Sequence, residues 1–178
     1  MSTSRRDVLK MAGVAFAGTA LPTITILNPN KAFAGVNADT LKVGLIGCGG
    51  RGSGAANQAL KADSNVVLHA VGDIFADKME ASLTGLRKVH GSKVTVDEGR
   101  KFIGFDAYQK VLDSGVDVVI LTTPPHFRPD HLMAAVKAGK HVFCEKPVAV
   151  DAQGVRKVLE AAKIAKQKKL SLMSGFCW

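Results

Sequence analysis

The sequence predicts an α/β protein with a doubly wound parallel sheet, and three observations support this fold class. Several short runs rich in Val, Ile and Leu are hydrophobic on both faces, as strands covered by helices must be. Amphipathic helical stretches separate these runs, and strands that alternate with helices form parallel sheets through right-handed crossovers. The chain of 178 residues, of which 47% are hydrophobic, is long enough to bury one core of this kind.

The expected strands follow one another as short apolar runs. We expect them at residues 41–46, 66–72, 116–122, 141–144 and 171–175. A further strand, third in the chain, lies in the ambiguous stretch "KVTVDEGRKFIGFDAY", either near residues 94–96 or near residues 102–105. The sequence contains neither an internal repeat nor a low-complexity tract.

Helical patterns fill the gaps between these strands. We expect helices at about residues 53–60, 77–90, 129–138 and 152–168. The last shows the clearest period, because Val155, Val158, Leu159 and Ala162 fall on one face after a plausible N-terminal cap at Asp151.

A glycine-rich turn joins the first strand to the first helix. In "GCGGRG", Gly47, Gly49 and Gly52 match the pattern G-x-G-x-x-G, and Gly50 and Arg51 lie in the same turn. In this position the first glycine permits the tight turn, the second lets a pyrophosphate approach the backbone, and the third lets helix and strand pack closely. The helix N-terminus supplies free N–H groups for the phosphates. The pattern predicts a Rossmann dinucleotide-binding domain.

Asp73 ends the second strand, about 20 residues beyond the glycines, where an acidic side chain binds the adenosine ribose in dinucleotide-binding folds. A carboxylate there would repel a 2′-phosphate, which favours NAD over NADP. Arg51 could instead serve a 2′-phosphate, so NADP stays an alternative. Asp73 could also be only a cap for the following helix.

The loop "TTPPHF" follows the strand on the other side of the expected switch in strand order. Ligands bind beyond the carboxyl ends of strands at that switch, so we expect a dinucleotide to lie along Thr122, Thr123, Pro124, Pro125 and His126. The prolines could alternatively only stiffen the loop. His126 and the nearby His131 are also compatible with surface or capping roles.

Charge and cysteine content exclude other classes of site. The net charge of +9 comes from 24 Lys and Arg against 15 Asp and Glu. Because the basic residues are scattered over the helices, we expect no nucleic-acid partner; the only basic cluster, near Lys166, complements a helix C-terminus. Cys48, Cys144 and Cys177 lack metal-ligand spacing, so we expect no metal site and interpret Cys48 and Cys144 as buried thiols.

The first 34 residues differ in character from the rest. Arg5 and Arg6 precede a short, weakly apolar stretch, and Ala32-Phe33-Ala34 forms a small-x-small cleavage site. This segment resembles a twin-arginine export signal, which implies the export machinery as a partner and a periplasmic or otherwise exported mature protein. A membrane anchor is the alternative, although the stretch is too short and too rich in Ala and Gly to span a bilayer well. The expected organisation is a signal peptide at 1–34, a linker at 35–40 and a Rossmann domain at 41–178.

The last motif is "AGKHVFCEKPVAVD", in which an expected buried strand is followed by Glu145-Lys146-Pro147. Together with the glycine pattern, Asp73 and "TTPP", it resembles the Gfo/Idh/MocA family of nicotinamide-dependent oxidoreductases from about Leu41 to Trp178. The resemblance implies that Lys146 is the catalytic residue, near the nicotinamide and bonded to the substrate hydroxyl, and that Glu145 helps to bind the cofactor. It also implies a sugar, inositol or related polyol as substrate and a Lys146–Pro147 bond that is often cis.

The chain departs from the family pattern in two places. Arg128 stands where many members carry a histidine, so the role of that histidine is not transferred. Members also continue into a second α+β domain that binds substrate and forms the oligomer interface, and this domain is absent from the present sequence. We therefore expect weak or no activity of this chain alone, and a homo-oligomer for a full-length parent. Two other functions remain open: an NAD-dependent glycosidase on the same scaffold, and a non-catalytic dinucleotide-binding module.

Overall fold

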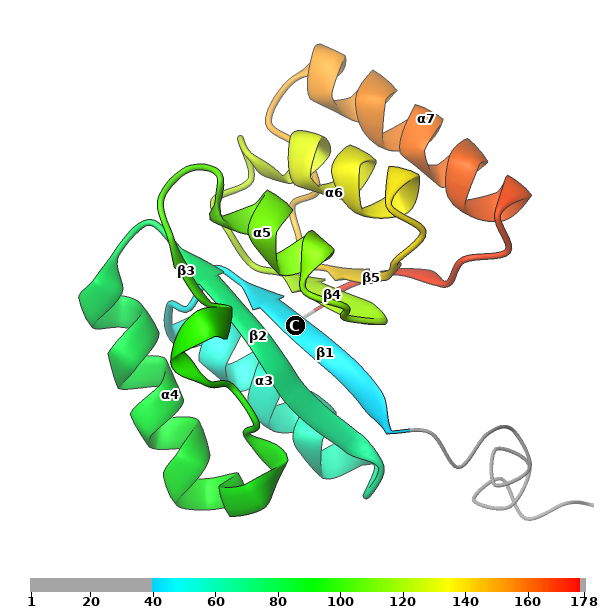
Figure 1. Ribbon diagram of the computed structural model, residues 1–178. Coiled ribbons are helices and arrows are strands. Elements are labelled where there is room, and N and C mark those ends of the chain that lie inside the picture. The colour runs from blue at the N-terminus through cyan, green and yellow to red at the C-terminus, as the bar shows by residue number, and fades with distance from the viewer. Residues whose placement is uncertain (1–39, 177–178) are drawn as a thin grey trace, which may run out of the picture. The chain divides into compact units, whose positions relative to one another are not determined.

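Six parallel strands form the sheet of the computed structural model, which describes residues 40–176 (Figure 1). Their order is β3-β2-β1-β4-β5-β6, and the strands are β1 (Leu41–Ile46), β2 (Val66–Asp73), β3 (Lys101–Ile103), β4 (Val118–Leu121), β5 (His141–Cys144) and β6 (Leu172–Ser174). This order confirms the predicted doubly wound fold. The predicted export signal, Cys177 and nearly all of the predicted linker lie outside the described residues.

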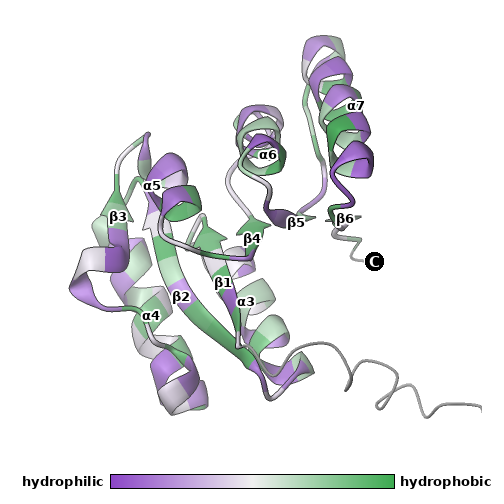
Figure 2. Cartoon of the chain, turned by 45° about the vertical axis from the view of Figure 1, so that its right-hand side comes forward, coloured by the Kyte–Doolittle hydropathy of each residue, from purple (hydrophilic) through white to green (hydrophobic). Residues whose placement is uncertain are grey.

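Helices cover both faces of this sheet. They are α3 (Gly50–Ala62), α4 (Ala76–His90), α5 (Ala107–Asp113), α6 (Arg128–Lys137) and α7 (Ala152–Gln167), with 3-10 turns at Gly91–Lys93 and Glu98–Arg100. Figure 1 shows α3 and α4 on one face and α5, α6 and α7 on the other. Because β-strand side chains alternate, each strand contributes to two core clusters: Leu45 packs on the α3 and α4 side, and Ile46 on the opposite side. The strands are accordingly mostly hydrophobic along their length (Figure 2).

In the ambiguous stretch, the third strand lies near the second of the two alternatives, and a further helix begins at the end of the stretch. The strand β3 pairs with β2 at Lys101–Ile103, while Val94 forms only an isolated parallel bridge with Leu68. Helix α5 was not predicted. It packs so closely on β1 and β2 that a Cβ atom at Gly44 would lie 2.6 Å from Val111 Cγ1. Gly44 therefore serves helix packing and not a ligand.

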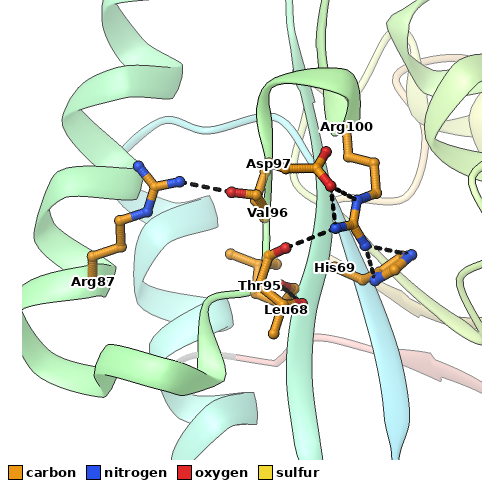
Figure 3. A network of polar contacts seen from close by, with 7 residues as sticks. All are labelled: Leu68, His69, Arg87, Thr95, Val96, Asp97 and Arg100. Atoms are coloured by element: carbon orange, nitrogen blue, oxygen red, sulfur yellow. Dashed lines mark hydrogen bonds and ion pairs between the residues drawn. The ribbon is translucent and has the colours of Figure 1, made fainter.

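Polar contacts fix the connection between α4 and β3 beside the edge of the sheet (Figure 3). Arg100 donates to the His69 ring at 2.6 Å and to the Thr95 carbonyl at 3.0 Å, and it forms an ion pair with Asp97. Arg87 donates to the Val96 carbonyl at 2.7 Å. Burial, and then the charge of Arg100, lower the pKa of His69, which keeps its ring neutral and able to accept.

Helix α7 differs from its prediction in the face that it buries. Asp151 caps its N-terminus by accepting a hydrogen bond from Gly154 N at 2.6 Å, as predicted. However, Val155 and Leu159 are 46% and 59% exposed, and the fully buried residues are Ala161 and Ala165. Val158 of the predicted face still packs against the core beside these alanines, so the predicted face is only partly buried.

The described part of the chain has neither a membrane-spanning helix nor a cluster of metal ligands. Among residues 40–176, no helix is both long and apolar enough to cross a membrane. The same residues contain no cluster of three or more His, Cys, Asp or Glu side chains suited to a metal ion. Cys48 and Cys144 are buried free thiols, as predicted, and burial raises their pKa to about 12 and about 11 respectively.

Candidate dinucleotide site at the switch point of the sheet

The candidate site lies where β1 and β4 are neighbours although they are not consecutive in the chain. At this switch point the connections that follow β1 and β4 lead to opposite faces of the sheet. The space beyond the carboxyl ends of the two strands is therefore open for a ligand. Gly47 follows β1 with φ of +95°, a conformation that favours glycine, and its N–H donates to the Gly72 carbonyl at 2.8 Å. The Thr122 hydroxyl, which follows β4, donates to the Gly47 carbonyl at 2.6 Å.

Gly52 brings the first turn of α3 against this turn. A Cβ atom at Gly52 would lie 1.9 Å from the Gly47 carbonyl oxygen and 2.7 Å from the Thr122 hydroxyl oxygen, so only glycine fits. Helix α3 therefore packs closely against the end of β1, as the third glycine of the pattern predicts.

The N-terminus of α3 is open for an anion. No side chain caps it, and its first turn contains no acidic residue. A Cβ atom added at Gly49 or Gly50 would meet nothing within 4 Å, so free space lies beside the backbone there. The outward-facing N–H groups of a helix N-terminus and the positive end of the helix dipole favour a phosphate at such a place.

Asp73 lies beside the turn at the end of the adjacent strand. Its Oδ2 accepts a hydrogen bond of 2.5 Å from Cys48 N, and its Oδ1 accepts one of 3.0 Å from Phe75 N. These bonds orient the half-exposed carboxylate toward the hollow in front of the turn. The second bond lies before α4, whose N-cap residue is Phe75 and has no side-chain cap, so Asp73 is not the cap of that helix.

A cavity of about 410 Å³ occupies this hollow. Six predicted site residues line it: Gly47, Gly49, Asp73, Thr122, Thr123 and Pro124. Residues that were not predicted as site residues also line it, among them the apolar or aromatic Ile74, Phe75, Phe105, Tyr108, Phe127 and His131 and the basic Lys78 and Arg128. The remaining predicted residues are outside its lining: Gly50, Arg51, Gly52, Pro125, His126, Glu145 and Lys146.

His131 is a buried wall of the cavity, so the surface role considered from the sequence is wrong for it. Its ring stacks on Tyr108 with centroids 4.2 Å apart, and Nδ1 lies 3.2 Å from the Thr123 hydroxyl. Burial lowers the pKa of His131 to about 4, which makes the ring neutral at physiological pH. His126, by contrast, is exposed, with its ring edge against Phe127.

Arg51 reaches from the glycine-rich turn to the end of β5. Its Nε and Nη2 donate to Glu145 Oε1 at 2.7 and 2.5 Å. Glu145 is 1% exposed. Its burial raises the pKa of the carboxyl, but the Arg51 bonds and charge outweigh this effect, and the net pKa is lowered. Because Arg51 is held by Glu145 and not by Asp73, its predicted alternative role toward a 2′-phosphate gains no support from this geometry.

Lys146 follows Glu145 at the carboxyl end of β5 and is exposed. The Lys146–Pro147 bond is cis, as the resemblance implies. The carbonyl groups on both sides of Lys146, those of Glu145 and Pro147, accept hydrogen bonds from the buried Arg128. The side chain of Lys146 is thus carried by a fixed piece of backbone beside the switch point.

These features fit an extended anionic ligand with an apolar end. The open helix N-terminus suits a pyrophosphate, Asp73 can accept hydrogen bonds from vicinal hydroxyls, and the apolar walls suit an aromatic base. A Cβ atom would find room at Gly49 and Gly50, so the packing of the protein itself does not require glycine at these two positions. The residues present therefore fit a dinucleotide, and the sequence pattern had indicated all of them except the apolar walls.

Comparison with known proteins agrees with this geometry. The sequence profile of the oxidoreductase family with an NAD-binding Rossmann fold, Gfo/Idh/MocA, matches residues 41–176. The chain is similar to the inositol 2-dehydrogenase of Salmonella typhimurium, with 34% identity over 137 residues, which cover 77% of this chain and 37% of that enzyme.

Solved structures show the same likeness. An NAD-binding protein from Listeria innocua superimposes with a TM-score of 0.59 and 30% identity, over 76% of this chain and 35% of that one. The apo scyllo-inositol dehydrogenase of Lactobacillus casei gives a TM-score of 0.58 and 26% identity, over 77% and 37% of the two chains. The present chain thus matches little more than a third of the length of these relatives.

Proposed function

The chain belongs to the Gfo/Idh/MocA family of oxidoreductases with an NAD-binding Rossmann fold, and from this premise we propose that it forms the cofactor-binding part of a polyol dehydrogenase. The proposed substrate is an inositol, a sugar or a related polyol. The observation that carries the proposal is the hydrogen bond of 2.5 Å from Cys48 N to Asp73 Oδ2, which joins the glycine-rich turn to Asp73. This contact supports a shared role in which the turn binds the pyrophosphate and Asp73 binds the adjacent ribose.

NAD is the cofactor that these residues favour. The carboxylate of Asp73 attracts ribose hydroxyls and repels a 2′-phosphate, and Arg51 is held away from it by Glu145. When bound, NAD⁺ would accept a hydride from a secondary alcohol carbon; the hydroxyl proton would pass to solvent, and the alcohol would become a ketone.

Lys146 is the proposed catalytic residue of this chain. Its exposed ammonium group can donate a hydrogen bond to the substrate oxygen, and this stabilises the negative charge that develops as the hydroxyl proton leaves. The relatives are inositol dehydrogenases by name, which supports a polyol as the substrate class. In the proposed enzyme, a further domain completes the substrate site and the subunit interface.

The test measures NAD binding and turnover in the protein purified from its own host. We expect Lys146→Ala to lower kcat for inositol oxidation by about 10²-fold or more while NAD affinity changes little. Lys163→Ala, at an exposed position of α7, is the control for loss of one lysine. Unchanged turnover in Lys146→Ala would refute the catalytic role. Release of a sugar without net formation of NADH would point to the glycosidase alternative.

We further propose that the protein is exported in folded form. The support is in the sequence: Arg5 and Arg6 at the start, and Ala32-Phe33-Ala34 before Gly35. Mass spectrometry of the protein from cell fractions tests this. The expected product is an exported chain that begins at Gly35, whereas an Arg5→Lys, Arg6→Lys double variant should stay inside the cell with its first 34 residues intact. Export of that double variant would contradict a twin-arginine route.

A further inference from the structure

Arg128 is a charged residue in an unusual place. It is the first residue of α6 and only 6% exposed, although arginine is almost never buried without partners. Its partners are three main-chain carbonyl groups. Nε donates to Thr123 O at 2.7 Å, and Nη1 donates to Glu145 O at 2.9 Å and to Pro147 O at 2.6 Å.

These acceptors belong to the two loops that border the site. Thr123 lies in the loop after β4 and lines the cavity, whereas Glu145 and Pro147 lie directly on either side of Lys146. Arg128 therefore ties the cavity wall to the segment that carries the proposed catalytic lysine. Because all three acceptors are backbone atoms, the contact fixes the path of the chain independently of the neighbouring side chains.

A guanidinium group is well suited to this arrangement. It presents five N–H donors in a planar fork, whereas lysine presents one point charge and a neutral histidine only one N–H. The Glu145 carboxylate accepts its side-chain hydrogen bonds from Arg51 and acts on Arg128 through its charge. Other bonds also hold this segment: Glu145 N donates to Leu121 O at 3.0 Å, Lys146 N donates to Glu145 Oε2 at 3.2 Å, and Cys144 Sγ contacts Glu145 O at 3.7 Å.

We propose that Arg128 is a positioning residue for Lys146. By holding the carbonyl groups before and after Lys146, it sets where the ammonium group stands relative to the cavity wall at Thr123. This inference rests on the proposed function for its catalytic consequence, but the placement of Lys146 itself can be measured without substrate or cofactor.

The experiment compares Arg128→Lys with the wild-type chain. Lysine side chains are labelled by reductive methylation with ¹³C-formaldehyde, and the Lys146 signal is assigned from its loss in Lys146→Arg. We expect the Lys146 signal to shift in Arg128→Lys in the apo protein, and its change on addition of NAD⁺ to be altered. Arg87→Lys is the matched control, because Arg87 also donates to a main-chain carbonyl, that of Val96, but away from the site.

In a preparation that oxidises inositol, Arg128→Lys should lower kcat by about 10²-fold, because a displacement of a catalytic group by about 1 Å can have this effect. The KM for NAD⁺ should stay within about twofold of the wild-type value. A purely structural role would instead change stability and affect both constants or neither. If Lys146 keeps its wild-type signal in a folded Arg128→Lys variant, or if only KM changes, the proposal is overturned.

Two measurements separate the possible failures. If wild-type protein does not bind NAD⁺, the proposed function fails, while the apo signal of Lys146 still decides the role of Arg128. If Arg128→Lys does not give a cooperative thermal transition, Arg128→His provides the second comparison. That variant retains at most two ring N–H donors, so it too must shift the Lys146 signal. A wild-type signal there would equally overturn the proposal.

Discussion

Arg51 and Glu145 lie 94 residues apart in the sequence, and the guanidinium group of the first donates two hydrogen bonds, of 2.7 and 2.5 Å, to one carboxylate oxygen of the second. The pair connects the turn after β1 with the end of β5, across β4. The site therefore has its own side-chain link between the phosphate-binding turn and the segment of Lys146, besides the hydrogen bonds of the sheet.

The first prediction concerns the stability that this pair supplies. Arg51→Met leaves the Glu145 carboxylate buried at 1% exposure without its main partner. We expect a loss of about 2 kcal/mol in the free energy of unfolding, below the range for fully buried pairs because the Arg51 side chain is 42% exposed. Urea denaturation measures it. The double variant Arg51→Met, Glu145→Gln should recover part of the loss, and equal stability of wild type and single variant would contradict the assignment.

The second prediction concerns the choice of nucleotide. Asp73→Asn keeps a carbonyl oxygen that can accept from Cys48 N but removes the charge that repels a 2′-phosphate. NAD affinity should fall about tenfold or more, in line with loss of charge-assisted hydrogen bonds, while NADP affinity falls less or rises. Isothermal titration with both nucleotides measures the ratio. Asp77→Asn, an exposed change in the first turn of α4, should leave it unchanged.

The third prediction uses two glycines of the same helix. Gly52→Ala places a Cβ atom 1.9 Å from the Gly47 carbonyl oxygen, so the first turn of α3 must move away from β1. We expect a loss of about 1–3 kcal/mol in stability and of tenfold or more in NAD affinity. Gly54→Ala, two residues further on, meets nothing within 4 Å and should instead stabilise the protein by about 0.5–1 kcal/mol. If both variants change stability and NAD affinity in the same way, the close contact at Gly52 is not the reason for glycine at that position.

The sequence predicts those parts of the structure that depend on neighbouring residues, and it misses those that depend on contacts between distant residues. The strands and the glycine-rich turn were predictable because their signals are local: apolar runs, and a motif whose spacing fixes its geometry. Helix α5 was missed because only seven residues form it, and because Gly44 and Gly72, which admit it, belong to distant strands. A clue was present in the spacing of Ala107 and Val111 before Gly115.

The side chains that meet across the site were the least predictable part. In the sequence, Arg128 differs from its neighbours only as a departure from a family pattern, and its three carbonyl partners lie between 5 and 19 residues away. His131 gave no sign of burial in its local sequence, because the ring of Tyr108 that covers it comes from α5. Such contacts depend on how loops approach one another once the sheet has formed, and no local pattern records them.

The fourth prediction concerns pH, and it follows from the burial of His131. Its pKa is lowered from 6.5 to about 4 in the folded chain, so the unfolded chain binds the additional proton between these values. Stability is therefore complete above about pH 6.5 and falls as pH decreases toward 4, by about 3 kcal/mol from this residue. His69 adds to the same trend, because burial and Arg100 also lower its pKa.

Urea denaturation between pH 4.5 and 7.5 tests the share of His131. In His131→Phe, whose ring can still stack on Tyr108, most of this fall in stability should be absent. Thr123→Val is the matched control: it removes the hydroxyl beside Nδ1 but leaves the imidazole buried, so the dependence on pH should remain. Burial, and not the hydroxyl, is the main cause of the lowered pKa of His131. This account is contradicted if the free energy of unfolding does not change with pH in Thr123→Val and changes as in the wild type in His131→Phe.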